Sequence, residues 1–397
     1  MTKGSKGGNG GTHSDTSLTR VGRNPGAYSG FVNTPIFKGS TVLFPDAERL
    51  ESRNVEYTYG RPSNPTTRAL ENALAELEGG DRTFLTSSGL SAITTTLLTF
   101  AESGGHILIT DSAYFPTRRF ANRVLKRMGV DVEFHDPLIG GGIASLIRPN
   151  TKLVLTESPG SQTFEIQDIP AICRAARAQG VPVAIDNTWG TPLYFRAFEH
   201  GANISIMSAT KYIVGHADAL LGAVTCDAST AQPLALTHEA LGQCPGSEDC
   251  FLALRGLRTL SVRLERHWRS GLAIAEWLRN RPEVAEVLHP ALPGAPGHEL
   301  WKRDFRGAAG LFSIILKPYP KEAVYRFLNA LQIFGMGYSW GGFESLIVPF
   351  DCSPARTATV WKPQGPALRL HIGLEDVEDL KCDLERGFAA IGEGDSA

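Results

Sequence analysis

The segment SIMSATKYIVGH, residues 205 to 216, says most about the fold of this chain. An apolar run that is typical of a buried strand ends in two hydroxyl residues, Ser208 and Thr210, and Lys211 follows at once. A charged lysine is costly to bury, so a lysine at this position must be neutralised, paired or covalently occupied. The alternative is an ordinary surface lysine after a strand, which this segment alone does not exclude.

The composition around this segment is that of an ordinary globular protein. The chain has 397 residues, too many for one simple core, and we expect at least two domains. Hydrophobic residues make up 42% and charged residues 20%, with a net charge of −2. No apolar run is long enough to span a membrane, and the N-terminus has no secretory pattern. We therefore expect a cytoplasmic protein without nucleic-acid or membrane partners.

Six cysteines are scattered along the chain, and no two of them form a CxxC pair. This spacing does not favour a zinc ribbon or a thioredoxin-like site. Cysteines this sparse in a chain this long rarely form a disulfide framework. We expect reduced thiols and no metal site.

The composition and the hydrophobic pattern of the sequence change along the chain and suggest four parts. Residues 1–16 are rich in Gly, Ser, Thr and Lys and are predicted to be a disordered tail. Residues 17–61 contain turn formers but no long periodic element, which suits an arm that wraps another surface. We assign residues 62–257 to a large domain and residues 258–397 to a smaller α+β domain.

Short apolar runs alternate with helical stretches through the large domain. Strands are predicted at 106–110, 130–136, 151–158, 181–187, 204–210 and 220–226. Several are apolar almost throughout, which is typical of a parallel sheet covered on both faces. The alternation predicts a doubly wound α/β domain. Farther on, residues 252–280 read as one long amphipathic helix with a break near Gly271.

Four features fall where ligands bind in such a sheet, at the ends of strands. The turn TSSGLSAI opens a helix whose free N–H groups suit an anion, although a plain helix cap explains it equally well. Asp186 ends an apolar strand and needs a donor or a cation. Lys211, if desolvated, becomes a nucleophile toward carbonyl groups. Arg369, in RLHIGLED, suits a carboxylate clamp or a structural ion pair.

Taken together, these features suggest one cofactor. A phosphate site, an acidic residue and a lysine 25 residues farther on match pyridoxal phosphate, PLP. The lysine would form the Schiff base, and Asp186 would keep the pyridine nitrogen protonated so that the ring acts as an electron sink.

The sequence also resembles a known family, the PLP enzymes of cysteine and methionine metabolism, which have fold type I. The resemblance runs over residues 17 to 390. Its motifs are YGRPSNPT (59–66), SSGLSAI (87–93), DSAYFPT (111–117), ESPGS (157–161), AIDNTW (184–189), SATKYIVGHAD (208–218), RGLRTLSVRL (255–264), SWGGFESL (339–346) and RLHIGLED (369–376). The resemblance implies a mostly parallel seven-stranded sheet in the large domain.

The resemblance assigns roles to matching residues. Lys211 would hold PLP and move protons, Asp186 would pair with the ring nitrogen, and Tyr114 would stack on the ring and help in proton transfer. The phosphate would be bound by Gly89, Leu90, Ser208 and Thr210, together with Tyr59 and Arg61 of a neighbouring subunit. Leu90 stands where the family usually has Met, a change that a backbone contact tolerates. Arg369 would bind the substrate α-carboxylate, helped by Ser339 and Trp340.

The activity implied by the resemblance is carbon–sulfur bond cleavage. ESPGS and SWGGFESL favour the bacterial members that split L-cystathionine by α,β-elimination into L-homocysteine, pyruvate and ammonia, a step of methionine biosynthesis with side activity on cysteine or cystine. The alternatives within the family are γ-elimination, γ-synthesis and sulfhydrylation of O-acylhomoserine. The family further implies a homotetramer, a dimer of dimers with active sites shared between subunits.

Overall fold

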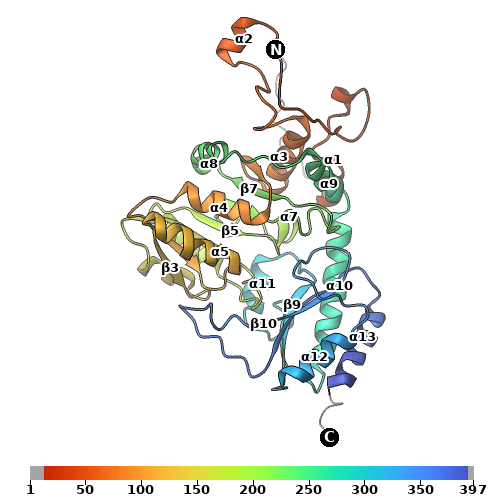
Figure 1. The fold of residues 1–397 in the computed structure, drawn as a ribbon. Helices are drawn as coiled ribbons and strands as arrows, with labels where there is room; N and C mark the ends of the chain where they lie inside the picture. Colours follow the sequence, from red (N-terminus) through yellow and green to blue (C-terminus); the bar gives the residue numbers. More distant parts are fainter. Residues whose placement is uncertain (1–12, 392–397) are drawn as a thin grey trace.

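The computed structural model describes residues 13–391, which form two sheets with helices packed around them (Figure 1). Helix α1 begins at Ser14, so residues 14–16, which we placed in a tail, belong to a helix instead. His13 is the N-cap of this helix, and residues 1–12 of the predicted tail lie outside the described residues. No helix within residues 13–391 is long and apolar enough to cross a membrane.

The larger sheet has seven strands in the order β1-β7-β6-β5-β4-β2-β3. Their bounds are β1 Arg82–Thr86, β2 His106–Thr110, β3 Asp131–His135, β4 Thr151–Glu157, β5 Val183–Asp186, β6 Ile204–Met207 and β7 Gly222–Cys226. Strands β3, β2, β4, β5 and β6 pair in parallel, and β7 is antiparallel to both β6 and β1. The predicted fold class, a mostly parallel seven-stranded sheet with a smaller α+β domain, is confirmed.

Helices cover both faces of this sheet, which is why its strands are apolar almost throughout. One face packs against α4 (Gly89–Thr99), α5 (Phe115–Phe120) and α8 (Ala228–Ala240). The other packs against α3 (Pro65–Glu78), α6 (Ile169–Arg177) and α9 (Ser247–Leu257). Shorter elements complete this part: α7 Thr191–Tyr194, η2 Ala121–Leu125, η3 Lys126–Met128 and η4 Gly140–Ser145.

A four-stranded antiparallel sheet in the order β10-β11-β9-β8 forms the second, smaller core. Its strands are β8 Val284–Leu288, β9 Leu311–Leu316, β10 Leu346–Phe350 and β11 Ala367–His371. Helices α11 (His298–Asp304), α12 (Lys321–Ala330) and α13 (Val377–Ile391) follow its strands in the chain. Helix α10 (Leu260–Arg279) links this half to the larger sheet (Figure 1).

The structure corrects two local predictions. The long helix expected at 252–280 is broken at Arg258 and Thr259, not near Gly271, which lies inside α10. Gly271 is tolerated there because α10 packs closely on Gly310, whose Cα would lie 3.0 Å from a Cβ at position 271. Strand β1 was not predicted because its five residues, RTFLT, contain only two apolar side chains, Phe84 and Leu85, and so do not form a clear apolar run.

The N-terminal segment is partly anchored and partly exposed. Leu18 of α1 (Ser14–Arg20) is buried, and Arg258 donates a hydrogen bond to its carbonyl oxygen at 2.6 Å. Beyond it, η1 (Pro25–Tyr28) and α2 (Ala47–Ser52) project away from the body of the molecule (Figure 1). Leu43 is 87% exposed and Phe31 is 74% exposed. These residues therefore form a projecting arm with an uncovered apolar surface.

Candidate active site

The carboxyl ends of neighbouring strands bring two acidic side chains together. Glu157 ends β4 and Asp186 ends β5, and the two residues are paired in register. Strand β6 lies next to β5 and leads directly into Ser208 and Lys211. Glu157, Asp186, Ser208 and Lys211 line one pocket at this edge. The sequence predicted this convergence for Asp186 and Lys211.

Asp186 is held at the floor of the pocket by its neighbour Thr188. Its Oδ1 accepts a hydrogen bond from the Thr188 backbone N–H at 3.0 Å and one from the Thr188 hydroxyl. Burial raises the pKa of Asp186, and the two hydrogen bonds from Thr188 oppose this effect. A buried carboxylate in this position favours a cationic N–H partner such as a protonated ring nitrogen.

Lys211 lies on the opposite side, against the segment that follows Tyr338. Its Nζ donates a hydrogen bond to Ser339 Oγ at 2.7 Å and lies 5.3 Å from the centre of the Trp340 ring. Burial, and then the positive charge of Arg369, lower the pKa of Lys211 to about 8. A lysine with a lowered pKa is a better nucleophile and proton acceptor near neutral pH.

Arg369 lies in β11 of the smaller sheet and reaches the same pocket. Its Nη2 donates to the carbonyl oxygens of Tyr338 and Ser339 at 3.0 and 3.3 Å. Its Nε is buried and has no hydrogen-bond partner among residues 13–391. Burial lowers the pKa of Arg369 to about 10. A guanidinium that is anchored at one nitrogen and free at another suits a carboxylate ligand.

The start of α4 forms a cradle for an anion. Ser88 caps the helix by accepting a hydrogen bond from the Ser91 N–H, which leaves the first N–H groups, at Gly89 and Leu90, without partners in the helix. A Cβ on Gly89 would lie only 2.4 Å from the Ser208 side chain, so the close approach of α4 to Ser208 requires glycine. This combination of helix N-terminus and hydroxyl is suited to a phosphate group.

Thr210 also lines the pocket, but its hydroxyl is engaged elsewhere. It accepts a hydrogen bond from the Leu221 N–H at 2.8 Å and donates to the Leu221 carbonyl oxygen at 3.2 Å. In this arrangement its hydroxyl hydrogen is directed at the backbone. The predicted contribution of Thr210 to phosphate binding stays a prediction.

Tyr114 stands at the mouth of the pocket, at the start of α5. Its backbone N–H donates to Glu157 Oε2 at 2.7 Å. Burial, followed by the negative charges of Glu157 and Asp186, raises the pKa of the Tyr114 hydroxyl. Burial and the nearby Asp186 also raise the pKa of Glu157 well above its usual value.

The segment SWGG is fixed to the backbone of Lys211. Gly341 has φ of +83°, and a Cβ there would lie 3.0 Å from Lys211 Cα, so this position requires glycine. The Gly341 N–H donates to Nε2 of the buried His371 at 3.1 Å. Ser339 is thereby brought within hydrogen-bond distance of the Lys211 amine, and Trp340 forms one wall of the pocket.

Two predicted residues do not reach this pocket within the same chain. Tyr59 pairs with Thr41 through a single antiparallel bridge in the projecting arm and is 47% exposed. Arg61 donates to the Glu239 carbonyl oxygen at 3.3 Å. Neither lines the pocket. Both were predicted to act on a neighbouring subunit.

Sequence reasoning missed Glu157 as a residue of the site, although it lay in a quoted motif. The signal was available, because Glu157 is a charged residue at the end of an apolar strand, as Asp186 is. Trp189, at the end of the AIDNTW motif, also lines the pocket, and its Nε1 donates to the Leu311 carbonyl oxygen at 3.0 Å. Among residues 13–391, no group of three or more His, Cys, Asp or Glu side chains is placed to hold a metal ion.

The groups around the pocket fit PLP in their chemistry. The primary amine, the buried carboxylate, and the cradle at Gly89 and Ser208 correspond to an aldehyde, a ring nitrogen and a phosphate. Together with the mostly parallel sheet and its smaller partner domain, they define a PLP-dependent enzyme of fold type I.

Comparison with known proteins identifies the family. The profile of the Cys/Met metabolism PLP-dependent enzyme family matches residues 15–389, and the chain belongs to that family. It is 52% identical to a putative cystathionine beta-lyase of Rhizobium johnstonii, over 95% of this chain and 96% of that protein. It is 43% identical to the cystathionine beta-lyase MetC of Escherichia coli, over 95% and 98%.

A solved structure is also similar. The cystathionine gamma synthase of Xanthomonas oryzae pv. oryzae, in complex with aminoacrylate and cysteine, matches with a TM-score of 0.89 and 33% identity, covering 96% of this chain and 99% of that one. The fold is therefore shared by family members whose names indicate different reactions.

Proposed function

We propose that the protein cleaves L-cystathionine by α,β-elimination into L-homocysteine, pyruvate and ammonia, as a step of methionine biosynthesis. The observation that carries this proposal is the placement of the Lys211 amine 2.7 Å from Ser339 Oγ, beside Trp340 and facing Arg369. The names of relatives at 52% and 43% identity support the same reaction.

In this proposal each residue of the pocket has a defined task. PLP, when bound, supplies an electron sink for negative charge at the substrate Cα. Arg369 binds the α-carboxylate through the nitrogens that its backbone contacts leave free. The Lys211 amine, held by Ser339, removes the Cα proton. The Cβ–S bond then breaks, and the departing thiolate takes a proton from Lys211 or Tyr114. The released aminoacrylate reacts with water to give pyruvate and ammonia.

The test is product analysis. The purified protein is loaded with PLP and given L-cystathionine, and both carbon products are identified. We expect pyruvate with homocysteine. A Lys211→Ala variant controls for reaction in solution, because it lacks the proton-accepting amine. Formation of 2-oxobutyrate with cysteine would contradict the proposal while leaving the cofactor and the family unchanged.

A second candidate is γ-chemistry, which the similarity to cystathionine gamma synthase favours. It needs a further deprotonation at Cβ, and the same residue types can perform it when they are positioned differently. We expect Trp340 to form the wall that separates the two outcomes. A Trp340→Leu variant should therefore give a larger share of 2-oxobutyrate, and an unchanged product ratio would exclude this role of Trp340.

We also propose that the chain works as a homotetramer, a dimer of dimers, in which the arm of residues 17–61 reaches a neighbouring subunit. The domain division at residues 62–257 and 258–397 belongs to the same proposal. The exposed apolar residues of the arm support it, as does the position of Tyr59 and Arg61 outside the pocket of their own chain. These two residues would then contact the phosphate in the neighbour.

Subunit mixing tests this arrangement. We expect the Lys211→Ala and Arg61→Ala variants each to be nearly inactive, because every active site of either variant lacks one required side chain. When the two are unfolded, mixed and refolded together, hybrid dimers carry one site with both residues intact. We expect activity to return toward a quarter of the wild-type value. No recovery in mixtures that sedimentation shows to be hybrid oligomers would contradict shared sites.

We propose a cytoplasmic location for the enzyme. All six cysteines within the described residues are free, which agrees with a reducing compartment.

A further inference from the structure

A long loop of the smaller sheet lies against the larger half of the molecule. Residues 351–366, here called the bridging loop, connect β10 to β11. Figure 1 shows this loop in blue, extending away from the smaller sheet toward α5 and β3. The mechanism proposed above gives it no role.

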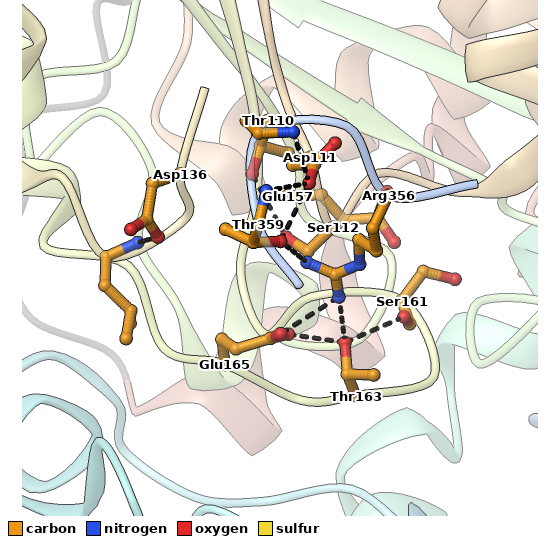
Figure 2. A network of polar contacts seen from close by, with 12 residues as sticks. Thr110, Asp111, Ser112, Asp136, Glu157, Ser161, Thr163, Glu165, Arg356 and Thr359 are labelled. Carbon is orange, nitrogen blue, oxygen red and sulfur yellow. Dashed lines mark hydrogen bonds and ion pairs between the residues drawn. The ribbon is translucent and has the colours of Figure 1, made fainter. Parts of the chain in front are cut away.

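Asp111 anchors one end of the contact. It follows β2, has a fully buried side chain, and accepts hydrogen bonds from the backbone N–H groups of Thr357, Ala358 and Thr359 at 2.8 to 3.2 Å. The Thr359 hydroxyl adds a bond at 2.8 Å, and Arg118 forms an ion pair with the same carboxylate. Figure 2 shows the Asp111 carboxylate facing Thr359. These donors lower the pKa of Asp111 despite its burial.

Arg356 anchors the other end. Its side chain is 4% exposed and donates to Glu165 Oε1 at 2.9 Å and to the Thr163 hydroxyl. The Thr163 hydroxyl donates in turn to Glu165 Oε2. Figure 2 shows the guanidinium of Arg356 facing Glu165 and Thr163. A buried, multiply bonded arginine–glutamate pair fixes geometry more strongly than an exposed pair does.

Both anchors lie next to residues that line the pocket. Asp111 is three residues before Tyr114. Thr163 and Glu165 belong to residues 158–165, here called the wall loop, of which Pro159, Gly160, Ser161, Gln162 and Phe164 line the pocket. The wall loop and the Tyr114 segment are also joined, because the Ser161 N–H donates to the Ser112 carbonyl oxygen at 2.9 Å.

The wall loop has a backbone that needs external support. Gln162 and Phe164 have φ values of +68° and +59°, a region that side chains other than glycine rarely adopt. Such conformations persist only where the surroundings hold them. The Arg356 contacts to Thr163 and Glu165 lie between and beside these two residues.

We propose that Arg356 and Asp111 are positioning residues, which hold the wall loop and the Tyr114 segment in place for the elimination reaction. The bridging loop thus transmits the position of the smaller sheet, which carries Arg369, to the opposite wall of the pocket. The proposal rests on the function proposed above. It predicts that the catalytic rate depends on a contact network that does not line the pocket.

The test uses two variants. Arg356→Gln breaks the ion pair with Glu165. Arg356→Lys keeps the positive charge but lacks the planar guanidinium that can bind several acceptors at once. With the PLP-loaded full-length enzyme and L-cystathionine, we expect kcat/KM to fall about tenfold to a hundredfold for Arg356→Gln, mainly through kcat, and less for Arg356→Lys. Hydrogen exchange at residues 112–116 and 158–165 should become faster, and the circular dichroism of the bound cofactor should change.

Arg303→Gln is the matched control. It breaks another ion pair between the two halves, from α11 to Asp168 at the start of α6, and neither of these residues lines the pocket. We expect its kcat/KM to stay within about twofold of wild type. An equal loss in both variants would show a general effect of docking and would overturn the proposal. So would an Arg356→Gln enzyme with unchanged kcat and lowered thermal stability, since that is a purely structural role.

A double-mutant cycle locates the effect. In a Tyr114→Phe background, Arg356→Gln should cost less activity than in wild type, because part of its effect passes through Tyr114. Strictly additive losses would contradict the proposal. If Arg356→Gln does not fold, Thr163→Val and Thr359→Val replace it, because each removes one hydroxyl from the network. Their kcat/KM, hydrogen exchange and cofactor circular dichroism are measured in the same way. If wild type does not cleave cystathionine, the proposed function fails, while hydrogen exchange still tests the positioning.

Discussion

At the scale of single residues, the pocket is governed by two cations that face each other. Lys211 and Arg369 are both half-buried, and the positive charge of Arg369 adds to the lowering of the Lys211 pKa that burial causes. Among residues 13–391, neither forms an ion pair within 4 Å. The pocket is therefore prepared for anionic ligands, and a substrate carboxylate at Arg369 relieves part of the repulsion.

The carboxylate clamp predicts the effect of Arg369→Lys. A lysine keeps the charge but lacks the second nitrogen that binds carboxylate while the first is held by Tyr338 and Ser339. We expect KM for L-cystathionine to rise roughly 30-fold to 100-fold, the equivalent of about 2 to 3 kcal/mol. Steady-state kinetics measures it. Arg266→Lys, on the exposed side of α10, serves as the control, and an unchanged KM in Arg369→Lys would exclude the clamp.

The lowered pKa of Lys211 predicts a pH dependence of stability in the protein freed of cofactor. Between pH 8 and 10.5 the unfolded chain holds a proton on this lysine that the native protein has lost. The free energy of unfolding should therefore contain a contribution that rises with pH across this window. Below pH 8, burial of the charged amine is destabilising by about 2 kcal/mol, after allowance for partial solvent access.

Lys211→Met is the test of that pH dependence. Urea unfolding of the variant without cofactor should show higher stability than wild type at pH 7 and a smaller rise toward pH 10. Equal slopes for the two proteins would mean that the amine is solvated like a surface lysine. The Lys152→Met variant, at an exposed ion pair with Glu102, controls for the loss of a lysine.

At the scale of elements, the motif YGRPSNPT has a structural task in addition to any role in binding. Asn64 caps α3, accepting hydrogen bonds from the Thr66 and Thr67 N–H groups, and the Thr67 hydroxyl accepts one from the Asn64 N–H. Pro65 occupies the first helical position, where its missing N–H has no cost. The motif therefore fixes where the arm ends and the first long helix begins.

This capping box predicts the effect of Asn64→Ala. The loss of the cap, and of the Asn64 Nδ2 bond to Ser247 Oγ at 3.1 Å, should lower the free energy of unfolding by about 1 to 2 kcal/mol. Denaturant unfolding of the full chain measures it. Asn64→Asp, which retains the capping oxygen, should recover most of the loss. Equal free energies of unfolding for Asn64→Ala and Asn64→Asp would show that the capping oxygen contributes nothing to stability.

At the scale of the whole molecule, several histidines are buried around the smaller sheet. His267 of α10 and His289 after β8 are almost fully buried, and burial lowers the pKa of each to about 4. His371 is also buried, with its ring 5.2 Å from that of His267, and burial lowers its pKa well below the usual value. The histidines are thus held neutral in the folded state.

Acid should therefore destabilise the molecule. Between pH 6.5 and about 4, the unfolded chain binds a proton at each of these histidines that the native state does not, so the free energy of unfolding falls as the pH falls. For His289 alone we expect a contribution on the order of 2 to 3 kcal/mol. His289→Asn keeps an acceptor for the Ala291 N–H and does not titrate, so it should flatten the profile from thermal melts at pH 4 to 7. A profile as steep as that of wild type would contradict this origin.

Local sequence patterns were enough to predict the cofactor and most of the fold. The apolar runs that end in Asp186 and Lys211, and the Ser-Ser-Gly turn before Leu90, are local patterns with local causes, namely burial of strands on both faces and exposed N–H groups at a helix start. They were sufficient to predict a doubly wound α/β domain and the cofactor, whereas the family and the seven-stranded sheet were expected from the resemblance of the longer motifs. Short or interrupted elements were harder to predict from the sequence, as strand β1 and the helix break at Arg258 show.

The full set of side chains around the pocket, and the contacts that hold them, became visible only in the folded chain. Asp111 and Thr357 are 246 residues apart, and neither segment contains a pattern that predicts their contact. A hydrogen bond between distant segments depends on the packing of everything between them. The same holds for Glu157, whose importance comes from its register with Asp186, and for His371, which places SWGG against Lys211. Local sequence specifies elements through short-range sterics and periodicity, whereas the distances that control reactivity are set by long-range packing.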